Sequence, residues 1–472
     1  DRMSQLLIRG KWVDGESTQT LTDKYQGREY GRMAVASEAQ VKQAIDGALE
    51  GFKAATLTPY ERYCILLEAS RVIASRAPKL IGLMCDEAGF THADGENEVR
   101  RCVQTLELSA EEAKRLSGEL VPMEAAAGVK NRLGFTIRVP RGVICAITPF
   151  NSPLNTLAHK VGPALAGGNA VVIKPSNVTP LSAVELCRAL IDAGLPASLL
   201  ALVHGPGAAI GRQLLADQRI AFYAFTGSTQ VGREIQQAAG LRGLQLELGS
   251  IASTIVCADA DIDLAIPKII NAGFRKAGQV CTSVQRLFVA RGIADRFIPK
   301  FVEAVRATPY GDPSDPKTVI GPMISLQHAE RAEAWVREAL DGGARLLAGG
   351  QRDGALFAPT VLHGVNDRMK VMCEEIFAPV VCIVEFDTID EAVAGANASD
   401  FGLAAGLFTQ DLKTALRTAR QLAFGGVHVN EASSARIDAM PFGGVKDSGY
   451  GREGPAYAIR EMTEERLITV AY

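Results

Sequence analysis

Gly142-Val-Ile-Cys-Ala-Ile-Thr148 and Ala170-Val-Val-Ile-Lys174 are two short apolar stretches, and the segment between them, Asn151–Ala166, has the pattern of a helix. Strands that are apolar along their whole length and alternate with helices are typical of a parallel sheet that is covered on both faces. This stretch therefore predicts an α/β fold.

The same alternation extends along the rest of the chain. After Lys174 we expect helix Pro180–Ala193, strand Leu199–His204, helix Gly207–Ala216, strand Ala221–Thr226 and helix Ser228–Ala239. A second run, from Ala252 to about Val429, includes strands Ala252–Cys257 and Arg286–Ala290 and helices Ile262–Lys276, Ala294–Ala307 and Leu326–Leu340. Two such runs predict two parallel-sheet α/β domains that join near Gly249.

The part of the chain before Gly142 is organised differently. We expect a hairpin over Gln5–Val13, two helices that begin after the capping boxes Ser37/Gln40 and Thr58/Glu61, and a third helix from about Glu96 to Leu116. The segment Leu120–Val139 is mixed in composition and ends in a strand pattern.

Composition limits the classes of function. The chain has 472 residues, is 47% hydrophobic and 22% charged, and carries a net charge of -3. We expect neither nucleic acid nor a membrane as a partner, because there is no basic run and no apolar run of roughly 18 residues. The nine cysteines form no CxxC pair, which is typical of a reduced cytosol and predicts no metal site. Without a signal-peptide pattern, a cytoplasmic location is expected.

One cysteine lies in a segment that suits a nucleophile. Cys281 belongs to Gly278-Gln-Val-Cys-Thr-Ser283, between a predicted helix and a predicted strand, and a sulfur on a loop is reachable. A single Cys is more often an inert, buried, small hydrophobe. The rest of the chain decides between these interpretations.

Two glycine-containing segments are candidates for a phosphate-binding loop. Gly205-Pro-Gly-Ala-Ala-Ile-Gly211 resembles a dinucleotide loop, but Pro206 and one extra residue depart from the usual pattern. Phe225-Thr-Gly-Ser228 leaves a strand and opens a helix, so its amides and the Ser228 hydroxyl would face an anion. Lys174, at the carboxyl end of a strand, would point into the crevice where ligands bind.

Seven short segments together resemble the NAD(P)-dependent aldehyde dehydrogenase superfamily. They are Thr148-Pro-Phe-Asn151, Ile173-Lys-Pro-Ser176, Phe225-Thr-Gly-Ser228, Leu246-Glu-Leu-Gly249, Gly278-Gln-Val-Cys281, Glu374-Glu-Ile-Phe377 and Pro441-Phe-Gly-Gly444. Each alone is weak, but all seven in the order and near the spacing of the family are very specific. The resemblance covers nearly the whole chain.

The resemblance implies a domain organisation and an oligomer. A Rossmann-like NAD(P)-binding domain would comprise residues 1–117 and 139–249, and a catalytic domain residues 250–443. A small β element, residues 118–138 and 455–472, would serve oligomerisation. Members of the family are commonly homodimers or homotetramers.

The resemblance also implies three catalytic roles, and general chemistry agrees with them. Cys281 would add to the aldehyde carbonyl. The side-chain amide of Asn151 and the backbone N–H of Cys281 would stabilise the oxyanion. Glu247 would activate the water that hydrolyses the resulting thioester. Simpler interpretations are a helix N-cap for Asn151 and an ordinary buried or paired carboxylate for Glu247.

For the cofactor, the resemblance implies that Lys174 touches the adenosine ribose and that Gly227 and Ser228 touch the pyrophosphate. Glu375 would hold the nicotinamide ribose, and Phe377 would pack beside the nicotinamide. Further cofactor residues are expected at Thr148, Phe150, Ser176, Asn177, Gly207, Gly211 and Gly249. The cofactor is expected to be NAD or NADP, and acceptance of NADP is predicted because the uncharged Asn177 replaces a Glu that would repel a 2′-phosphate.

The substrate is expected to be small and either hydroxylated or anionic. Ser152, Asn155, Thr156 and His159 share one helix face, which is either a polar tunnel wall or a solvent-exposed surface. Arg436 or Arg101 would meet an anionic tail, and Val280 and Thr282 flank the nucleophile.

Two alternatives use the same fold. A coenzyme A-acylating relative would generally lack the base at Glu247, and a non-catalytic relative would tolerate loss of Cys281, Glu247 or Asn151. All three residues are present. A papain-like thiol hydrolase is not supported, because nothing in the sequence pairs a His with Cys281.

Overall fold

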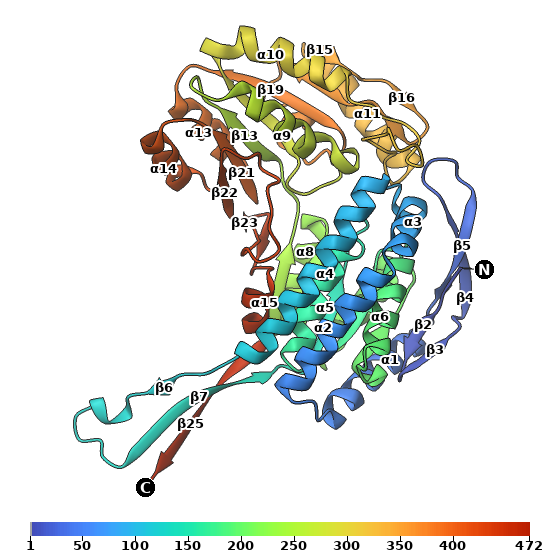
Figure 1. Ribbon diagram of the computed structural model, residues 1–472, viewed down its shortest axis with the longest axis vertical. Helices are drawn as coiled ribbons and strands as arrows, with labels where there is room; N and C mark the ends of the chain where they lie inside the picture. Colours follow the sequence, from blue (N-terminus) through green and yellow to red (C-terminus); the bar gives the residue numbers. More distant parts are fainter. Residues whose placement is uncertain (1) are drawn as a thin grey trace.

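The structure is a computed structural model that describes residues 2–472 (Figure 1). Its first large sheet has eight strands, and the central ones are parallel. In spatial order they are β24 (Gly449–Tyr450), β12 (Gly243–Glu247), β11 (Ile220–Thr226), β8 (Val143–Ile147), β9 (Ala170–Lys174), β10 (Leu200–Leu202), β2 (Leu6–Ile8) and β3 (Lys11–Val13). The predicted parallel sheet is confirmed, and the predicted N-terminal hairpin forms its β2–β3 edge.

The second large sheet has seven strands and is also mainly parallel. Their order is β15 (Arg345–Ala348), β18 (Thr360–His363), β19 (Val380–Phe386), β14 (Val284–Ala290), β13 (Ala252–Val256), β21 (Ala404–Phe408) and β22 (Gly426–Val429). The chain passes from the first sheet to the second between Glu247 and Ala252. In Figure 1 this sheet and its helices form the upper part of the molecule.

Helices bury the strands, as the apolar strand sequences predict. All five residues of β9 and all seven of β14 are buried. The helices with the first sheet are α1 (Glu38–Ala54), α2 (Pro59–Ser75), α3 (Ala77–Ala88), α4 (His92–Arg115), α5 (Asn155–Ala166), α6 (Leu181–Asp192), α7 (Gly207–Ala216) and α8 (Thr229–Ala239). With the second sheet lie α9 (Ile262–Phe274), α10 (Arg291–Arg306), α11 (Leu326–Asp341), α13 (Ile389–Asn397) and α14 (Leu412–Gln421).

Local sequence signals set several helix ends correctly. Both predicted capping boxes are present, at Ser37/Gln40 and at Thr58/Glu61. Helix α4 begins four residues before the predicted Glu96, because Thr91 caps it. Helix α3 and the hairpin of β4 (Ser17–Thr22) with β5 (Glu29–Val35) were not predicted.

Helices α5 and α9 are each shorter than predicted at one end, and both differences fall next to candidate site residues. Helix α5 begins at Asn155, so Asn151 is not its N-cap. Helix α9 ends at Phe274 instead of Lys276, because a 3-10 turn follows in which Lys276 and Ala277 have positive φ. The chain therefore turns sharply just before Gly278.

A third, smaller sheet projects from the body of the molecule (Figure 1). Its long strands, β7 (Arg132–Pro140) and β25 (Thr463–Ala471), pair along their whole nine-residue length, and β6 (Leu120–Val121) lies beside β7. The short helix α15 (Pro455–Glu461) precedes β25.

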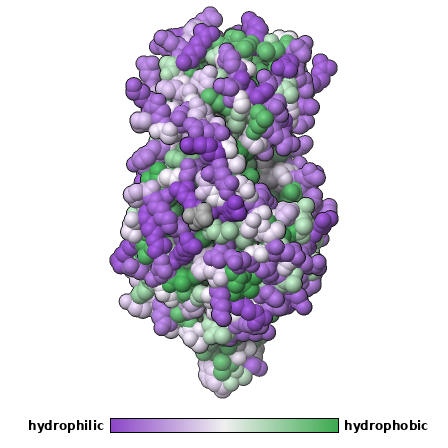
Figure 2. All heavy atoms as spheres, turned by 90° about the vertical axis from the view of Figure 1, so that its right-hand side faces the viewer, coloured by the Kyte–Doolittle hydropathy of each residue, from purple (hydrophilic) through white to green (hydrophobic). Residues whose placement is uncertain are grey.

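Hydrophilic side chains dominate the face drawn in Figure 2, with apolar ones scattered between them. Within residues 2–472, none of the helices is long and apolar enough to cross a membrane.

Candidate active site

A cavity of about 480 Å³ lies where the carboxyl ends of the first sheet's strands meet the loops before and after the second sheet's strands. Ligands of open parallel sheets bind at this edge. The predicted site residues that line the cavity are Thr148, Phe150, Asn151, Lys174, Ser176, Asn177, Gly207, Gly227, Ser228, Cys281, Glu375 and Phe377. Residues far apart in the sequence thus meet as predicted.

The end of the cavity formed by the first sheet suits an anion. Helices α7 and α8 both begin at it, at Gly207 and just after Ser228, so both glycine-containing segments contribute. The Ser228 hydroxyl caps α8 by accepting from the amide of Val231 at 3.3 Å. Free amides in the first turn of a helix bind phosphates.

Lys174 is buried beside these helix ends. Its Nζ donates to the Pro175 carbonyl at 2.9 Å and to Asn177 Oδ1 at 3.2 Å. Burial lowers the pKa of Lys174 to about 8. An ammonium held against an uncharged amide is available to a ribose or to a 2′-phosphate.

The opposite end of the cavity has the features expected for a nicotinamide ribose. Glu375 Oε1 accepts from the Ser250 amide at 3.1 Å, and burial raises the Glu375 pKa to about 7. The Phe377 ring stands edge-on to Phe150, with 5.8 Å between the ring centroids. The residues present therefore fit a dinucleotide along the cavity.

Two predicted cofactor residues do not line this cavity. Gly211 lies four residues along α7 from Gly207. Gly249 lies behind Glu375, where an added Cβ would be 3.0 Å from Glu375 Oε2, and its amide donates to Thr229 Oγ1 at 3.2 Å. A glycine at 249 therefore makes room for the carboxylate.

Two other lining residues, His328 and Arg331, were not predicted. They lie three residues apart on α11, so they share a helix face. The His328 and Phe150 ring centroids are 6.0 Å apart, and Arg331 donates to the Ile376 carbonyl at 2.8 Å. The sequence predicted only that both lie on a helix, Leu326–Leu340, and nothing in it brings α11 to the cavity.

The loop that carries Cys281 is fixed by a glycine and by the Gln279 side chain. Gly278 has a φ of 69°, and an added Cβ would lie 2.1 Å from the Ala378 carbonyl oxygen, so only glycine fits. The Gln279 side chain accepts from the Ile324 amide at 2.9 Å and donates to the Lys276 carbonyl at 3.1 Å.

Cys281 and Asn151 meet at the cavity. Asn151 Nδ2 donates one hydrogen bond, to the Gln279 carbonyl at 2.8 Å. Since an amide nitrogen carries two hydrogens, the other remains for a ligand. Burial, followed by the charge of Glu247, raises the Cys281 pKa to about 12.

Glu247 ends strand β12 and is buried, with 2% of its surface exposed. Neither carboxylate oxygen has a hydrogen-bond partner in the described chain. Burial, then repulsion by Glu453, raises the pKa of Glu247 well above its ordinary value. An unpaired buried carboxyl is costly, and such groups cluster at functional sites.

The polar face of α5 is not exposed to solvent, so that interpretation is wrong. Asn155, Thr156 and His159 are all buried. His159 Nε2 lies 2.8 Å from Asp438 Oδ1, and Thr105 Oγ1 donates to Asn155 Oδ1 at 2.7 Å. Asn155 and His159 Nε2 are thus hydrogen-bonded within the protein, whereas His159 Nδ1 has no hydrogen-bond partner among the described residues.

The two arginines predicted to meet an anionic tail both have internal partners. Arg101 Nη2 donates to Asp438 Oδ1 at 2.9 Å, and Arg436 Nη2 donates to Glu453 Oε1 at 3.2 Å. The sequence could not predict these ion pairs, because their carboxylates come from a distant loop and from the segment before α15. Of the residues flanking Cys281, Val280 is half-buried and Thr282 buried, and neither lines the cofactor cavity.

Arg275 is the cation that sequence reasoning missed. Among residues 2–472 no carboxylate lies within 4.0 Å of its guanidinium, and none of its nitrogens donates a hydrogen bond. Only Nε is both enclosed and unpartnered. Burial lowers the Arg275 pKa, and Cys281 is among the groups whose charge acts on it. Among residues 2–472 the Arg275 guanidinium thus has no internal partner, and it lies close enough to Cys281 for their charges to interact.

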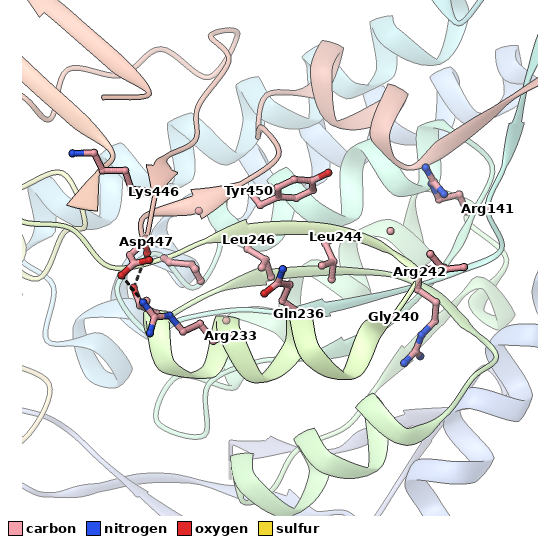
Figure 3. A pocket seen from close by; sticks show the side chains of 16 residues that line it. Arg141, Arg233, Gln236, Gly240, Arg242, Leu244, Leu246, Lys446, Asp447 and Tyr450 are labelled. Carbon is pink, nitrogen blue, oxygen red and sulfur yellow. Dashed lines mark hydrogen bonds and ion pairs between the residues drawn. The ribbon is translucent and has the colours of Figure 1, made fainter. Parts of the chain in front are cut away.

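A second hollow, of about 640 Å³, lies between α8, β12 and β24 (Figure 3). Its floor is apolar, with Leu244 and Leu246, and its arginines are paired: Arg233 with Asp447, and Arg242 with backbone carbonyls. None of the predicted site residues lines it. In the described chain, no three His, Cys, Asp or Glu side chains are grouped so as to hold a metal ion.

Comparison with known proteins agrees with this geometry. The model of the Aldehyde dehydrogenase family matches residues 12–468. A 3-sulfolactaldehyde dehydrogenase of Priestia aryabhattai is 46% identical over 465 residues, 98% of this chain and 97% of the relative.

Two solved structures superpose closely. Aldehyde dehydrogenase 21 of Physcomitrella patens, in complex with the reaction product succinate, has a TM-score of 0.97 and 34% identity, covering 100% of this chain and 98% of that one. A glyceraldehyde-3-phosphate dehydrogenase of Methanocaldococcus jannaschii complexed with NADP has a TM-score of 0.93 and 37% identity, covering 98% and 100%.

Proposed function

Because this chain belongs to the aldehyde dehydrogenase family, we propose that it oxidises a small anionic aldehyde to the carboxylic acid through a thioester on Cys281. The observation that carries the proposal is that Cys281 and the Asn151 amide share one cavity with the cofactor residues. Glu247 supplies a buried carboxyl group that has no hydrogen-bond partner among residues 2–472.

In the first step the Cys281 thiol loses its proton to water, and the thiolate adds to the carbonyl carbon. The carbonyl oxygen becomes an oxyanion, which accepts from the free N–H of Asn151 and the backbone N–H of Cys281. The hydrogen bond from Asn151 Nδ2 to the Gln279 carbonyl orients the amide before the substrate arrives.

Collapse of the tetrahedral adduct expels hydride and leaves the thioester on Cys281. A bound NAD or NADP would supply the acceptor for this hydride. Lys174, the first turn of α8 and Glu375 would hold the dinucleotide, and the Phe377 and Phe150 rings would exclude water from its reactive end.

In the last step Glu247 takes a proton from a water molecule, and the resulting hydroxide attacks the thioester. The C–S bond breaks, the acid leaves, and the proton held by Glu247 passes to the Cys281 sulfur, which restores the thiol. The test measures absorbance of the reduced cofactor and identifies the product, with and without coenzyme A. We expect the free acid at a rate that coenzyme A does not change, whereas an acyl-coenzyme A product would reject the hydrolytic mechanism.

Arg275 supports an anionic tail on the substrate. Arg275 is half-buried, its enclosed Nε has no hydrogen-bond partner among the described residues, and an anionic ligand would supply the missing hydrogen bonds. The relative from Priestia aryabhattai is named for an aldehyde with a sulfonate group. We therefore propose 3-sulfolactaldehyde, and after it semialdehydes, lactaldehyde and glyceraldehyde, as the first substrates to test.

Arg275→Met should lower kcat/KM for 3-sulfolactaldehyde or succinic semialdehyde by about 100-fold, equivalent to roughly 2.7 kcal/mol. The same change should alter kcat/KM for propanal less than about threefold, because propanal has no charge to bind. Arg275→Lys is the control that keeps the charge. Its kcat/KM for the charged aldehydes should lie between those of the wild type and Arg275→Met. Equal losses for charged and neutral aldehydes, or a preference of the wild type for hexanal or benzaldehyde, would reject this assignment.

NADP should be accepted, with kcat/KM within about a hundredfold of that for NAD, since Asn177 has no charge to repel a 2′-phosphate. Asn177→Glu should lower kcat/KM for NADP at least about tenfold while leaving NAD within a few-fold. Initial rates with each cofactor at a fixed aldehyde concentration measure both. A wild-type kcat/KM for NAD that exceeds the value for NADP by more than about a hundredfold would contradict the role of Asn177.

We also infer that the projecting sheet joins copies of this chain into a homodimer or homotetramer. Strand β25 is at its edge, and Leu467, Val470 and Leu120 are exposed on the sheet. Long apolar edge strands are rarely left uncovered. Light scattering should give a mass of two or four chains, and Leu467→Lys should reduce it. A wild-type monomer would reject the inference.

A further inference from the structure

Two segments that the proposed reaction brings together belong to different halves of the molecule. Asn151 follows a strand of the first sheet, and Cys281 precedes a strand of the second. Loop Arg275–Gly278 joins α9 to the nucleophile segment and contains Lys276 and Ala277 at φ values of 53° and 55°. Left-handed backbone at two residues with side chains is strained and persists only where surrounding contacts impose it.

Lys276 makes two of those contacts with its side chain. Its Nζ donates to the Asn151 carbonyl at 2.9 Å and to Glu98 Oε2 at 3.2 Å. The Phe90 ring lies below the ammonium, 4.6 Å from it. The ammonium of the nucleophile loop is thus bonded to the backbone of the residue that carries the oxyanion donor.

Glu98 holds the other side of this junction from helix α4. Its Oε1 accepts from Ser152 Oγ at 2.7 Å and from the amides of Leu154 and Asn155 at 3.2 and 2.9 Å. Leu154, the residue at the N-cap of α5, makes no side-chain cap. Glu98 therefore replaces the missing cap and fixes the turn that connects Asn151 to α5.

The contacts close a ring. The Lys276 side chain bonds the Asn151 backbone, the Asn151 side chain bonds the Gln279 backbone, and the Gln279 side chain returns to the Lys276 carbonyl. Glu98 anchors this ring from outside. Both members of the pair are enclosed, with 0% of the Glu98 side chain and 8% of the Lys276 side chain exposed.

We propose that Glu98 and Lys276 are positioning residues that set the Asn151 amide against Cys281 for addition to the aldehyde. The inference rests on the proposed function, because it takes Asn151 as the oxyanion donor. A purely structural ion pair would stabilise the fold without favouring one step of the reaction. The two interpretations differ in what happens to acylation when the fold is intact.

The experiment uses the full chain with NADP and compares Lys276→Met, Glu98→Gln and the double variant. Methionine keeps much of the length of the lysine stem, and the double variant leaves neither charge unpaired, so it should fold. The rate constant of the NADPH burst reports acylation, and thermal unfolding reports the fold. Alkylation of Cys281 by iodoacetamide reports the thiol alone, since that reaction forms no oxyanion.

The double variant should lower the burst rate constant by about 30-fold or more, a typical loss when an oxyanion donor is misplaced. Alkylation should stay within about threefold, because besides burial the charges that act most on the Cys281 thiol are those of Glu247, Glu375, Arg436 and Glu453. When Asn151→Ala is already present, adding the double variant should lower the burst rate constant by less than about a further threefold, because Glu98 and Lys276 act through Asn151.

Lys268→Met is the matched control. Lys268 is on α9, the helix that leads into the Lys276 loop, and its Nζ likewise bridges a backbone carbonyl, that of Asn430, and a carboxylate, that of Glu431. Its loss should leave the burst unchanged. An unchanged burst in the folded double variant, a parallel fall in alkylation, or full additivity with Asn151→Ala would overturn the positioning role. If Asn151→Ala itself leaves the burst intact, the oxyanion assignment fails and the positioning role fails with it.

Discussion

Cys281→Ala should reduce steady-state aldehyde oxidation by at least about 10⁴-fold, because the covalent adduct cannot form without the thiol. The dissociation constant of the cofactor should change by less than about threefold, since the residues that line the rest of the cavity remain in place. Absorbance of the reduced cofactor measures the first quantity, and quenching of protein fluorescence by NADP measures the second.

Cys373→Ala is the control for this prediction. Cys373 is also a free cysteine, but it is exposed and does not line the cofactor cavity. Its removal should leave the rate unchanged. Turnover at the wild-type level in Cys281→Ala would show that Cys281 is not the nucleophile.

Glu247→Gln should leave a burst of reduced cofactor that approaches one equivalent per site, followed by turnover that is about 10²- to 10⁴-fold slower than in the wild type. The burst survives because addition and hydride loss do not need the base, whereas hydrolysis does. Stopped-flow absorbance separates the two phases. If burst and steady state fall together, Glu247 acts before the thioester forms.

The pH dependence gives an independent check on the same residue. Burial and the neighbouring Glu453 raise the Glu247 pKa well above its ordinary value, so the carboxyl gains its base form at higher pH than an ordinary glutamate does. The wild-type hydrolysis rate should therefore increase with pH beyond the range in which an ordinary glutamate titrates, and the slow phase of Glu247→Gln should lack this increase. A flat wild-type profile would contradict the raised pKa.

The sequence predicted those parts of the fold that depend on local signals. Apolar strands such as Ala170–Lys174 indicate burial on both faces, and the capping boxes at Ser37 and Thr58 give helix starts. The start of α5 was wrong because its cap is Glu98, on another helix and more than fifty residues away in the sequence. A cap supplied through tertiary contact leaves no local signal.

The candidate site was likewise predicted only in those parts that local sequence motifs indicate. Residues within motifs, such as Lys174, Gly227 and Glu375, line the cavity as expected. The roles of the arginines were not predicted, because the sequence does not reveal that Arg101 and Arg436 have acidic partners while Arg275 has none among the described residues. Charge pairing in a buried network depends on three-dimensional proximity, and sequence spacing does not report it.

The central claim is the thioester on Cys281, and trapping that intermediate tests it most directly. Glu247→Gln is mixed with NADP and 3-sulfolactaldehyde, quenched in acid at the end of the burst, digested and analysed by mass spectrometry. The peptide containing Cys281 should gain the mass of the acyl group, and hydroxylamine should release that group. The corresponding peptide of Cys281→Ala should gain no mass. A burst of reduced cofactor with Cys281 unmodified, or with the acyl group on another residue, would contradict it.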